Sequence, residues 1–62
     1  MMLLEKGEFI RHKITKAIKW IEQIDKHNKF ITLGVMEYKD RKYLKTFELV
    51  TFKEFYERYE DI

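Results

Sequence analysis

The sequence contains no cysteine, no proline and only two glycines. Without cysteine, neither a disulfide nor a thiolate metal site can support the fold, and the absence fits a reducing compartment. No apolar run approaches the roughly 20 residues of a membrane span. The N-terminal stretch "MMLLEKG" is too short for a signal peptide and reaches Glu5 too early. We therefore expect a cytoplasmic protein that makes no membrane contact.

The motifs of common enzyme and cofactor sites are also missing. There is no Gly-rich phosphate loop, no nucleophile elbow and no zinc-ligand spacing. His12 and His27 each lie next to a lysine, which is typical of a solvated surface rather than of a general base. The acids of residues 54–61 surround Arg58, which favours pairing along a helix over metal binding. We expect no enzyme activity, no metal and no cofactor.

The chain of 62 residues predicts a single domain, 1–62, near the smallest size that folds alone. Such a domain buries only about 60% of the surface that its unfolded chain exposes. Its core commonly supplies about 3–5 kcal/mol, so additional support is often needed. The supports left to this sequence are its aromatic residues (five Phe, four Tyr and one Trp) and self-association, for example as a homodimer.

Residues 8–28 fit two structures, and the choice between them decides the fold. Their apolar residues repeat at helical spacing, and neither Gly nor Pro interrupts residues 8–33. The composition favours strands, because the region is rich in Ile and without Leu, and β-branched residues lose rotamer freedom in a helix. Basic residues near the start and acids near the end would also oppose the helix macrodipole. We prefer two strands, 8–14 and 17–25, to a helix over 8–27.

Residues 29–49 form two apolar-rich runs around the polar turn "KDR". Ile31, Leu33 and Val35 alternate to one face of a first strand, 29–38. In the second run, a strand over 42–49, one face carries Tyr43, Phe47 and Leu49. Gly34 inside the first strand is typical of a bulge or of a sharp bend in a curled sheet.

Residues 51–60 carry the signals of a helix. Thr51 and Glu54 form a capping box, and Val50 and Phe55 stand at the positions of a hydrophobic staple around it. Four aromatic residues then repeat at i, i+3, i+4 and i+7, which places them on one stripe. The members of this stripe are Phe52, Phe55, Tyr56 and Tyr59.

Together these segments predict a mainly β fold with one helix. Short strands must hide their edges, and closure into a small four-stranded SH3-like barrel does so. The expected elements are strands 8–14, 17–25, 29–38 and 42–49, followed by a C-terminal helix over 51–60. The alternative is an α+β fold with helix 8–27, strands 29–38 and 42–49, and helix 51–60. Because a lone hairpin is only marginally stable, that version would form a dimer.

Two resemblances accompany this pattern. The succession of "KGEFIRHK", "KWIEQID", "KFITL" and "FELVTFKEFYERYE" resembles small SH3-like barrel proteins of phages and mobile elements, whose function is mostly unknown. The sequence departs from that pattern because the turn at residues 15–16 lacks a glycine. Residues 31–59 also resemble the small phage inhibitors of uracil-DNA glycosylase. Those inhibitors are acidic DNA mimics, whereas this chain has a formal net charge of +2.

The candidate binding residues gather around the turn between the last two strands. Nucleic-acid-binding barrels combine cations that follow the phosphates with aromatic rings on which bases stack. Lysines also keep sheet edges soluble and unpaired, so a purely structural role stays open. The expected nucleic-acid-binding residues are Tyr38, Lys39, Arg41, Lys42, Tyr43 and Lys45, extended by Lys16, Lys19 and Trp20 if residues 8–25 form strands.

We therefore expect a non-catalytic binding module, with nucleic acid as its first candidate partner. The second candidate is a host protein, which would make the chain a phage-encoded inhibitor or adaptor acting on a host or defence enzyme. Tyr56 is the expected anchor for such a protein partner, because tyrosine is frequent at interfaces. The third candidate is a small structural homo-oligomer.

Overall fold

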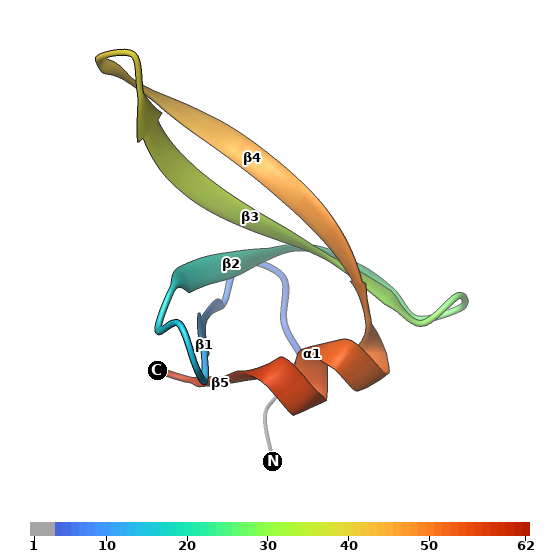
Figure 1. The fold of residues 1–62 in the computed structure, drawn as a ribbon. Helices are drawn as coiled ribbons and strands as arrows, with labels where there is room; N and C mark the ends of the chain where they lie inside the picture. Colours follow the sequence, from blue (N-terminus) through green and yellow to red (C-terminus); the bar gives the residue numbers. More distant parts are fainter. Residues whose placement is uncertain (1–3) are drawn as a thin grey trace.

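The computed structural model describes residues 4–62 and shows one antiparallel sheet with one short helix (Figure 1). The sheet has five strands in the order β4–β3–β2–β1–β5. Along the chain the elements are β1 (Phe9–His12), β2 (Ile18–Asp25), β3 (Phe30–Lys39), β4 (Lys42–Thr51), α1 (Phe52–Arg58) and β5 (Tyr59–Asp61). The expected mainly β fold with one helix is confirmed, and the four predicted strands are all present.

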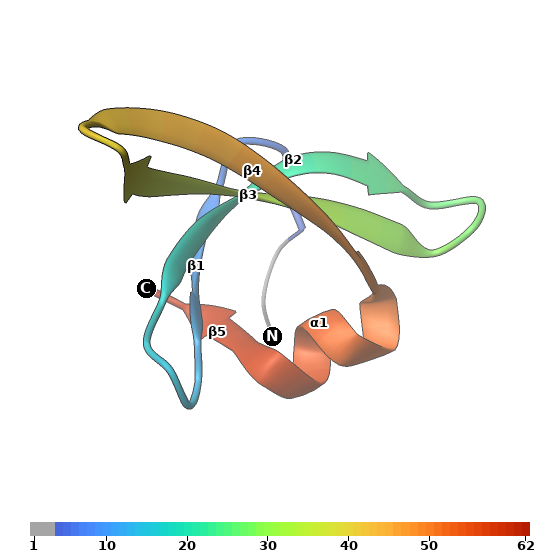
Figure 2. The same ribbon diagram turned by 45° about the horizontal axis from the view of Figure 1, so that its top comes forward.

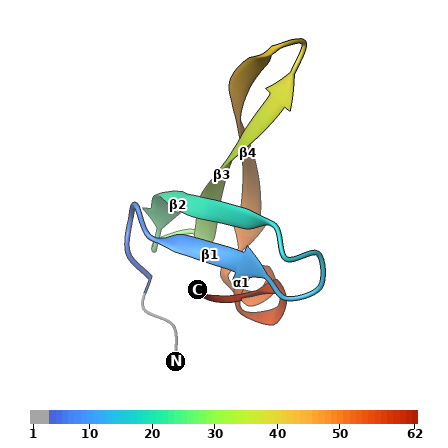
Figure 3. The same cartoon turned by 90° about the vertical axis from the view of Figure 1, so that its left-hand side faces the viewer.

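The sheet bends over α1 but does not close, which differs from the expected barrel (Figure 2). Its two outermost strands in the described part of the chain, β4 and β5, are not hydrogen-bonded to each other. The β3–β4 hairpin extends well beyond β1 and β2 (Figure 3). As a result, the radius of gyration is 11.8 Å, compared with about 10.6 Å for a compact domain of this length.

Residues 8–27 form two strands, so the alternative of one helix over this range is wrong. β1 pairs antiparallel with β2. This arrangement buries Ile10 and Ile21 completely on one face of the sheet. Ile14, which helical periodicity placed with them, lies in the turn and is 84% exposed. The Ile-rich composition, rather than the helical spacing, was the informative signal.

The first turn explains why β1 ends at His12 and not at residue 14. The Nδ1 atom of His12 accepts hydrogen bonds from the backbone N–H groups of Ile14 and Thr15, at 3.1 and 3.2 Å. The N–H of Lys16 donates to the His12 carbonyl at 3.0 Å. Lys16 adopts a left-handed φ of 65°. The turn that lacks a glycine is therefore made by a lysine in a conformation that glycine adopts at lower cost.

The capping box of α1 is confirmed, but the helix is shorter than predicted. The hydroxyl of Thr51 accepts from the Glu54 N–H at 3.1 Å, and the Glu54 carboxylate accepts from the Thr51 N–H at 3.0 Å. The helix ends at Arg58, because Tyr59 is extended and begins β5. β5 pairs with β1. The free edge of β1 offers backbone partners that replace the hydrogen bonds of a further helical turn.

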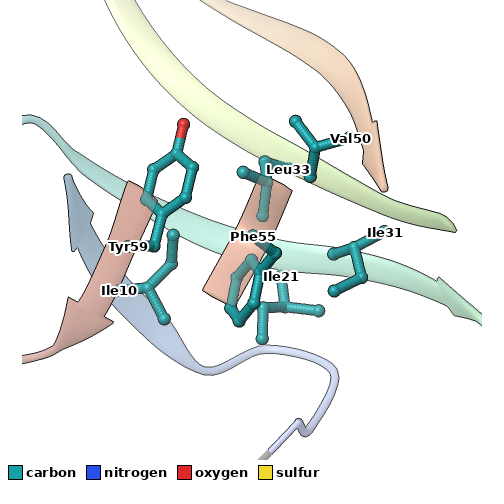
Figure 4. Close-up of a cluster of buried hydrophobic side chains, with 7 residues drawn as sticks. All are labelled: Ile10, Ile21, Ile31, Leu33, Val50, Phe55 and Tyr59. Atoms are coloured by element: carbon teal, nitrogen blue, oxygen red, sulfur yellow. The ribbon is translucent and has the colours of Figure 1, made fainter. Parts of the chain in front are cut away.

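One hydrophobic core lies between α1 and the inner side of the sheet (Figure 4). Phe55 and Tyr59 stack in it, with ring centroids 5.7 Å apart. Phe52 packs partly against the same cluster. The buried members are Ile10, Ile21, Ile31, Leu33, Val50, Phe55 and Tyr59. Three of the four residues of the predicted aromatic stripe, Phe52, Phe55 and Tyr59, therefore pack against one face of the sheet, whereas Tyr56 is exposed.

Gly34 is required by the side chain next to it on β2. The register places Trp20 directly opposite Gly34. A Cβ atom at position 34 would lie 2.6 Å from the Trp20 Nε1 atom and still closer to the ring carbons Cε2 and Cζ2. The indole therefore lies across the glycine. Gly34 gives room to Trp20, which is a different role from the bend that the sequence predicted.

We expect Gly34→Ala to destabilise the protein by about 1–3 kcal/mol, because Trp20 must leave its position to make room for the methyl group. Urea unfolding followed by circular dichroism measures the change. In a Trp20→Ala background the same substitution should cost much less, since the clash is gone. An equal cost in both backgrounds would show that Trp20 is not the reason for the glycine.

Candidate binding surfaces

The pairing register divides the exposed part of the sheet into two faces. Successive residues of a strand point to opposite sides, and directly paired residues point to the same side. The inner face contacts α1. We call the opposite side the outer face; it carries Phe9 and Arg11 of β1, Ile18 and Trp20 of β2, Gly34, Met36 and Tyr38 of β3, and Tyr43, Lys45, Phe47 and Leu49 of β4.

An aromatic row crosses the middle of the outer face. Phe9 pairs with Trp20, Trp20 with Gly34, and Gly34 with Phe47, so four adjacent strands contribute. The Trp20 indole covers Gly34 and donates from Nε1 to the Glu22 carboxylate at 2.7 Å. Phe9 and Phe47 remain 57% and 54% exposed. No element of the described chain covers this row.

Aliphatic side chains extend the row in both directions. Ile18 and Met36 are 46% and 48% exposed, and Leu49 is 63% exposed. The sequence predicted that Phe47, Leu49 and Tyr43 share one face of their strand, and the register agrees. That face is the outer one, whereas the core contribution of β4 comes from Val50. The apolar outer face was missed because alternation alone does not tell which side of a strand the core covers.

The basic residues of the β3–β4 turn are divided between the two faces. Asp40 and Arg41 form the turn, both with positive φ. Lys39 pairs with Lys42 on the side away from the outer face. On the outer face, Lys45 lies opposite Met36. Among residues 4–62, no ion pair within 4 Å involves any of the four predicted cations Lys39, Arg41, Lys42 and Lys45.

Tyr38 and Tyr43 form a pair at this end of the outer face. They lie directly opposite each other across β3 and β4, and their ring centroids are 4.9 Å apart. Both side chains are well exposed, at 64% and 71%. The structure therefore brings two predicted aromatics and Lys45 together on one face, next to Arg41 in the turn.

The other predicted residues do not join this group. Lys16 lies in the β1–β2 turn, a separate loop from the β3–β4 turn (Figure 1). Trp20 lies on the outer face, but Lys19 points to the inner face, because adjacent residues of a strand alternate. Tyr56 of α1 is 41% exposed, and its ring contacts Phe55 edge-on with centroids 5.6 Å apart.

Lys19 belongs to a polar cluster at the rim of the core. Its ammonium group donates to the Glu48 carboxylate and, at 3.0 Å, to the Tyr59 hydroxyl. The Tyr59 hydroxyl in turn donates to Glu48 at 3.0 Å. The cluster joins β2, β4 and β5. Sequence reasoning placed Lys19 on a binding surface and missed this structural role.

The cluster shifts the pKa of each of its members. The hydrogen bond from Lys19 lowers the pKa of Glu48, against an opposing effect of burial. Burial raises the pKa of the Tyr59 hydroxyl. For Lys19, burial alone lowers the pKa, but the bonds to Glu48 and Tyr59 together outweigh it, so its pKa is raised. The charged forms of Glu48 and Lys19 are thus favoured by folding.

A shallow groove of about 540 Å³ lies at the opposite end of the outer face from the tyrosine pair. Its walls include Gln23, Asp25, Phe30, Thr32 and Leu49, together with residues of the β2–β3 turn. That turn is held by Asp25, whose carboxylate accepts from the backbone and side-chain N–H groups of Asn28 at 3.0 and 2.9 Å. These bonds lower the pKa of Asp25.

The described residues contain no group of three or more His, Cys, Asp or Glu side chains placed to hold a metal ion. None of the helices in that part of the chain is long and apolar enough to cross a membrane.

Comparisons of the chain with protein-family models, curated proteins and solved structures found no match. The resemblances to SH3-like phage proteins and to inhibitors of uracil-DNA glycosylase therefore stay predictions.

The Glu48 cluster predicts a specific pH dependence of stability. Folding lowers the pKa of Glu48 below its ordinary value of 4.5. Its contribution to the free energy of unfolding is therefore fully present above pH 4.5 and is lost as the pH falls through the lowered pKa. Folding raises the pKa values of Lys19 and Tyr59, whose ordinary values are 10.5 and 10.0. Their contribution to the free energy of unfolding is therefore fully present when the pH is below these ordinary values. That contribution is lost as the pH rises through the raised values.

We expect Glu48→Gln to flatten the loss of unfolding free energy between about pH 5 and about pH 2. Urea unfolding at a series of pH values, followed by the fluorescence of Trp20, measures the slope. Glu37→Gln, a substitution of another exposed glutamate on the same sheet, should leave the acid slope unchanged. An unchanged slope in Glu48→Gln would mean that the cluster does not couple to folding.

Proposed function

We propose that this protein is a non-catalytic module that binds another protein through the outer face of its sheet. The observation that carries the proposal is the aromatic row Phe9–Trp20–Phe47, which crosses four strands and is left uncovered by the only helix of the described chain. Soluble proteins rarely expose large contiguous apolar patches, and those that do use them for interactions. An inhibitor or adaptor of a host enzyme would act through such a face.

The composition of the outer face favours a protein over a nucleic acid. Ile18, Met36 and Leu49 lie among the aromatic rings, and aliphatic side chains offer neither charge for phosphates nor rings for bases. The centre of a protein interface, by contrast, is enriched in aromatic residues and methionine and poor in charge. The middle of this face has that composition: the carboxylate nearest to it, that of Glu22, accepts a hydrogen bond from the Trp20 indole, and the nearest cation, Lys45, lies on the outermost strand β4.

We expect Phe47→Lys to abolish capture of a protein partner, because it places a charge at the centre of the apolar face. A central aromatic anchor is commonly worth 2 kcal/mol or more, so the affinity should fall by at least about 30-fold. The measurement is a pull-down from nuclease-treated host lysate with the immobilised protein, quantified by mass spectrometry.

Ile14→Lys is the matched control for this pull-down. It introduces the same charge at an exposed isoleucine in the β1–β2 turn, away from the outer face. It should capture the same partner as the unchanged protein. Equal capture by Phe47→Lys would contradict binding through the outer face.

The β3–β4 hairpin favours nucleic acid as a second candidate. Its four cations make no ion pair within the described chain, and two of the neighbouring aromatics, Tyr38 and Tyr43, are exposed on one face. Base stacking on such rings contributes roughly 1–3 kcal/mol per base. Two acids, Glu37 and Asp40, reduce the net charge of this segment, so the expected affinity is modest.

If the hairpin binds single strands, the logarithm of affinity should fall with the logarithm of salt concentration with a slope of up to about −3, the value for four phosphate contacts. Arg41→Ala should make that slope shallower by about 0.7. Fluorescence anisotropy with a labelled oligonucleotide measures both. Lys53→Ala, on the exposed side of α1, is the control. Binding that is independent of salt, or equally affected by both variants, would exclude the hairpin as the site.

A further inference from the structure

We propose that the partner of the outer face is a second copy of this chain, so that two sheets pack face to face as a two-fold symmetric dimer. This inference rests on the proposed function, because it uses the same outer face, and it makes a second copy rather than a host protein the occupant of that face. Three features of the structure support a second copy: the area of the outer face, the excess surface of the single chain, and the placement of the tyrosine pair and the groove on opposite sides of the Gly34–Phe47 pair.

The apolar area of the outer face matches one side of a stable interface. Seven of its large apolar side chains are between 46% and 71% exposed. A fully exposed aromatic side chain presents about 150–250 Å²; with the lower end of that range for the aliphatic ones, the seven partly exposed side chains contribute about 700 Å² together. A stable interface of standard size buries about 800 Å² per partner. The seven are Phe9, Ile18, Met36, Tyr38, Tyr43, Phe47 and Leu49.

The single chain also exposes more surface than its mass requires. Its accessible surface is 4907 Å², whereas a compact monomer of 7.8 kDa exposes about 4,400 Å². The extended β3–β4 hairpin accounts for an elongated shape of 37 × 23 × 16 Å. In two-layered β proteins, a second sheet covers such a face at a distance of about 10 Å. Here the chain supplies no second layer within the described residues.

The tyrosine pair and the groove lie on opposite sides of the Gly34–Phe47 pair, at similar separations along the strands. On β3, Tyr38 lies four residues to one side of Gly34, and Phe30 lies four residues to the other. On β4, Lys45 and Leu49 lie two residues to either side of Phe47. We place the two-fold axis in the plane between the two sheets, perpendicular to the strands and level with the Gly34–Phe47 pair. Rotation about this axis reverses the strand direction, so the tyrosine pair of one copy lies over the groove of the other. The exposed Tyr38 and Tyr43 rings would fill that groove, whose walls include Phe30 and Leu49.

The oligomeric state of the intact protein tests the proposal directly. Sedimentation equilibrium across the micromolar to millimolar range should show a reversible dimer. Phe47→Lys should raise its dissociation constant by at least about 30-fold, whereas Ile14→Lys should leave it unchanged. Circular dichroism verifies that both variants keep the β fold. A monomer at every concentration, or equal dissociation constants for both variants, would overturn the dimer.

Cross-linking tests the orientation of the two copies, and the lack of native cysteine makes it specific. Lys45→Cys mixed with Leu49→Cys should be joined by a short bis-maleimide at least several-fold more often than Lys45→Cys with itself. The reverse preference would overturn the proposed axis.

If the protein is monomeric but Phe47→Lys still loses a partner from lysate, the proposed function stands without the dimer. If both experiments are negative, both proposals fall.

Discussion

The structure depends on a single constraint: one short helix can cover only one face of a five-stranded sheet. α1 has seven residues and lies against the inner face, where the buried Phe55 and the partly buried Phe52 pack with core residues of β2, β3 and β4. Among residues 4–62 no other element covers the opposite side. The exposed aromatic row, the extended hairpin and the excess accessible surface all follow from that shortage of covering structure.

The polar cluster of Lys19, Glu48 and Tyr59 shows how the edge of this small core is closed. Three strands meet there through side chains whose hydrogen bonds are mutually satisfied. Within the described chain, no buried side-chain nitrogen or oxygen lacks a partner. Leaving such a group unpaired costs about 1–3 kcal/mol, a large share of the stability that a domain of this size has. The inner face is therefore specified in detail, while the outer face is simple in composition and open.

Much of the fold could be predicted from local chemistry, and the errors arose where distant segments meet. The strands and the capping box at Thr51 depend on composition and spacing within a few residues, so the sequence contains the signal. The end of α1 depends on the free edge of β1, about 49 residues away along the chain, where Arg11 binds Glu60. Helical periodicity through Tyr59 carries no information about that edge. The open sheet has the same origin, because the fifth strand occupies the position where a barrel would close.

The candidate site was also predictable only where it depends on residues that are close in the sequence. Tyr38, Tyr43 and Lys45 share a face because they lie on adjacent paired strands, and alternation in the sequence already groups them. The side of the sheet to which they point was not predictable, since both sides of β4 carry apolar residues. Lys19 was misplaced because its partner Glu48 lies on another strand. The sequence therefore predicted the β3–β4 hairpin, but it did not predict which face of that hairpin α1 covers.

The pairing of β5 with β1 has a consequence for synthesis on the ribosome. β1 is synthesised before the other four strands, yet its outer edge is satisfied only when residues 59–61 arrive. Until then the nascent chain holds an unpaired strand edge and an incomplete core, because Tyr59 belongs to both. Contacts between such distant segments slow folding and expose the chain to aggregation. We therefore expect the domain to fold after its translation rather than during it.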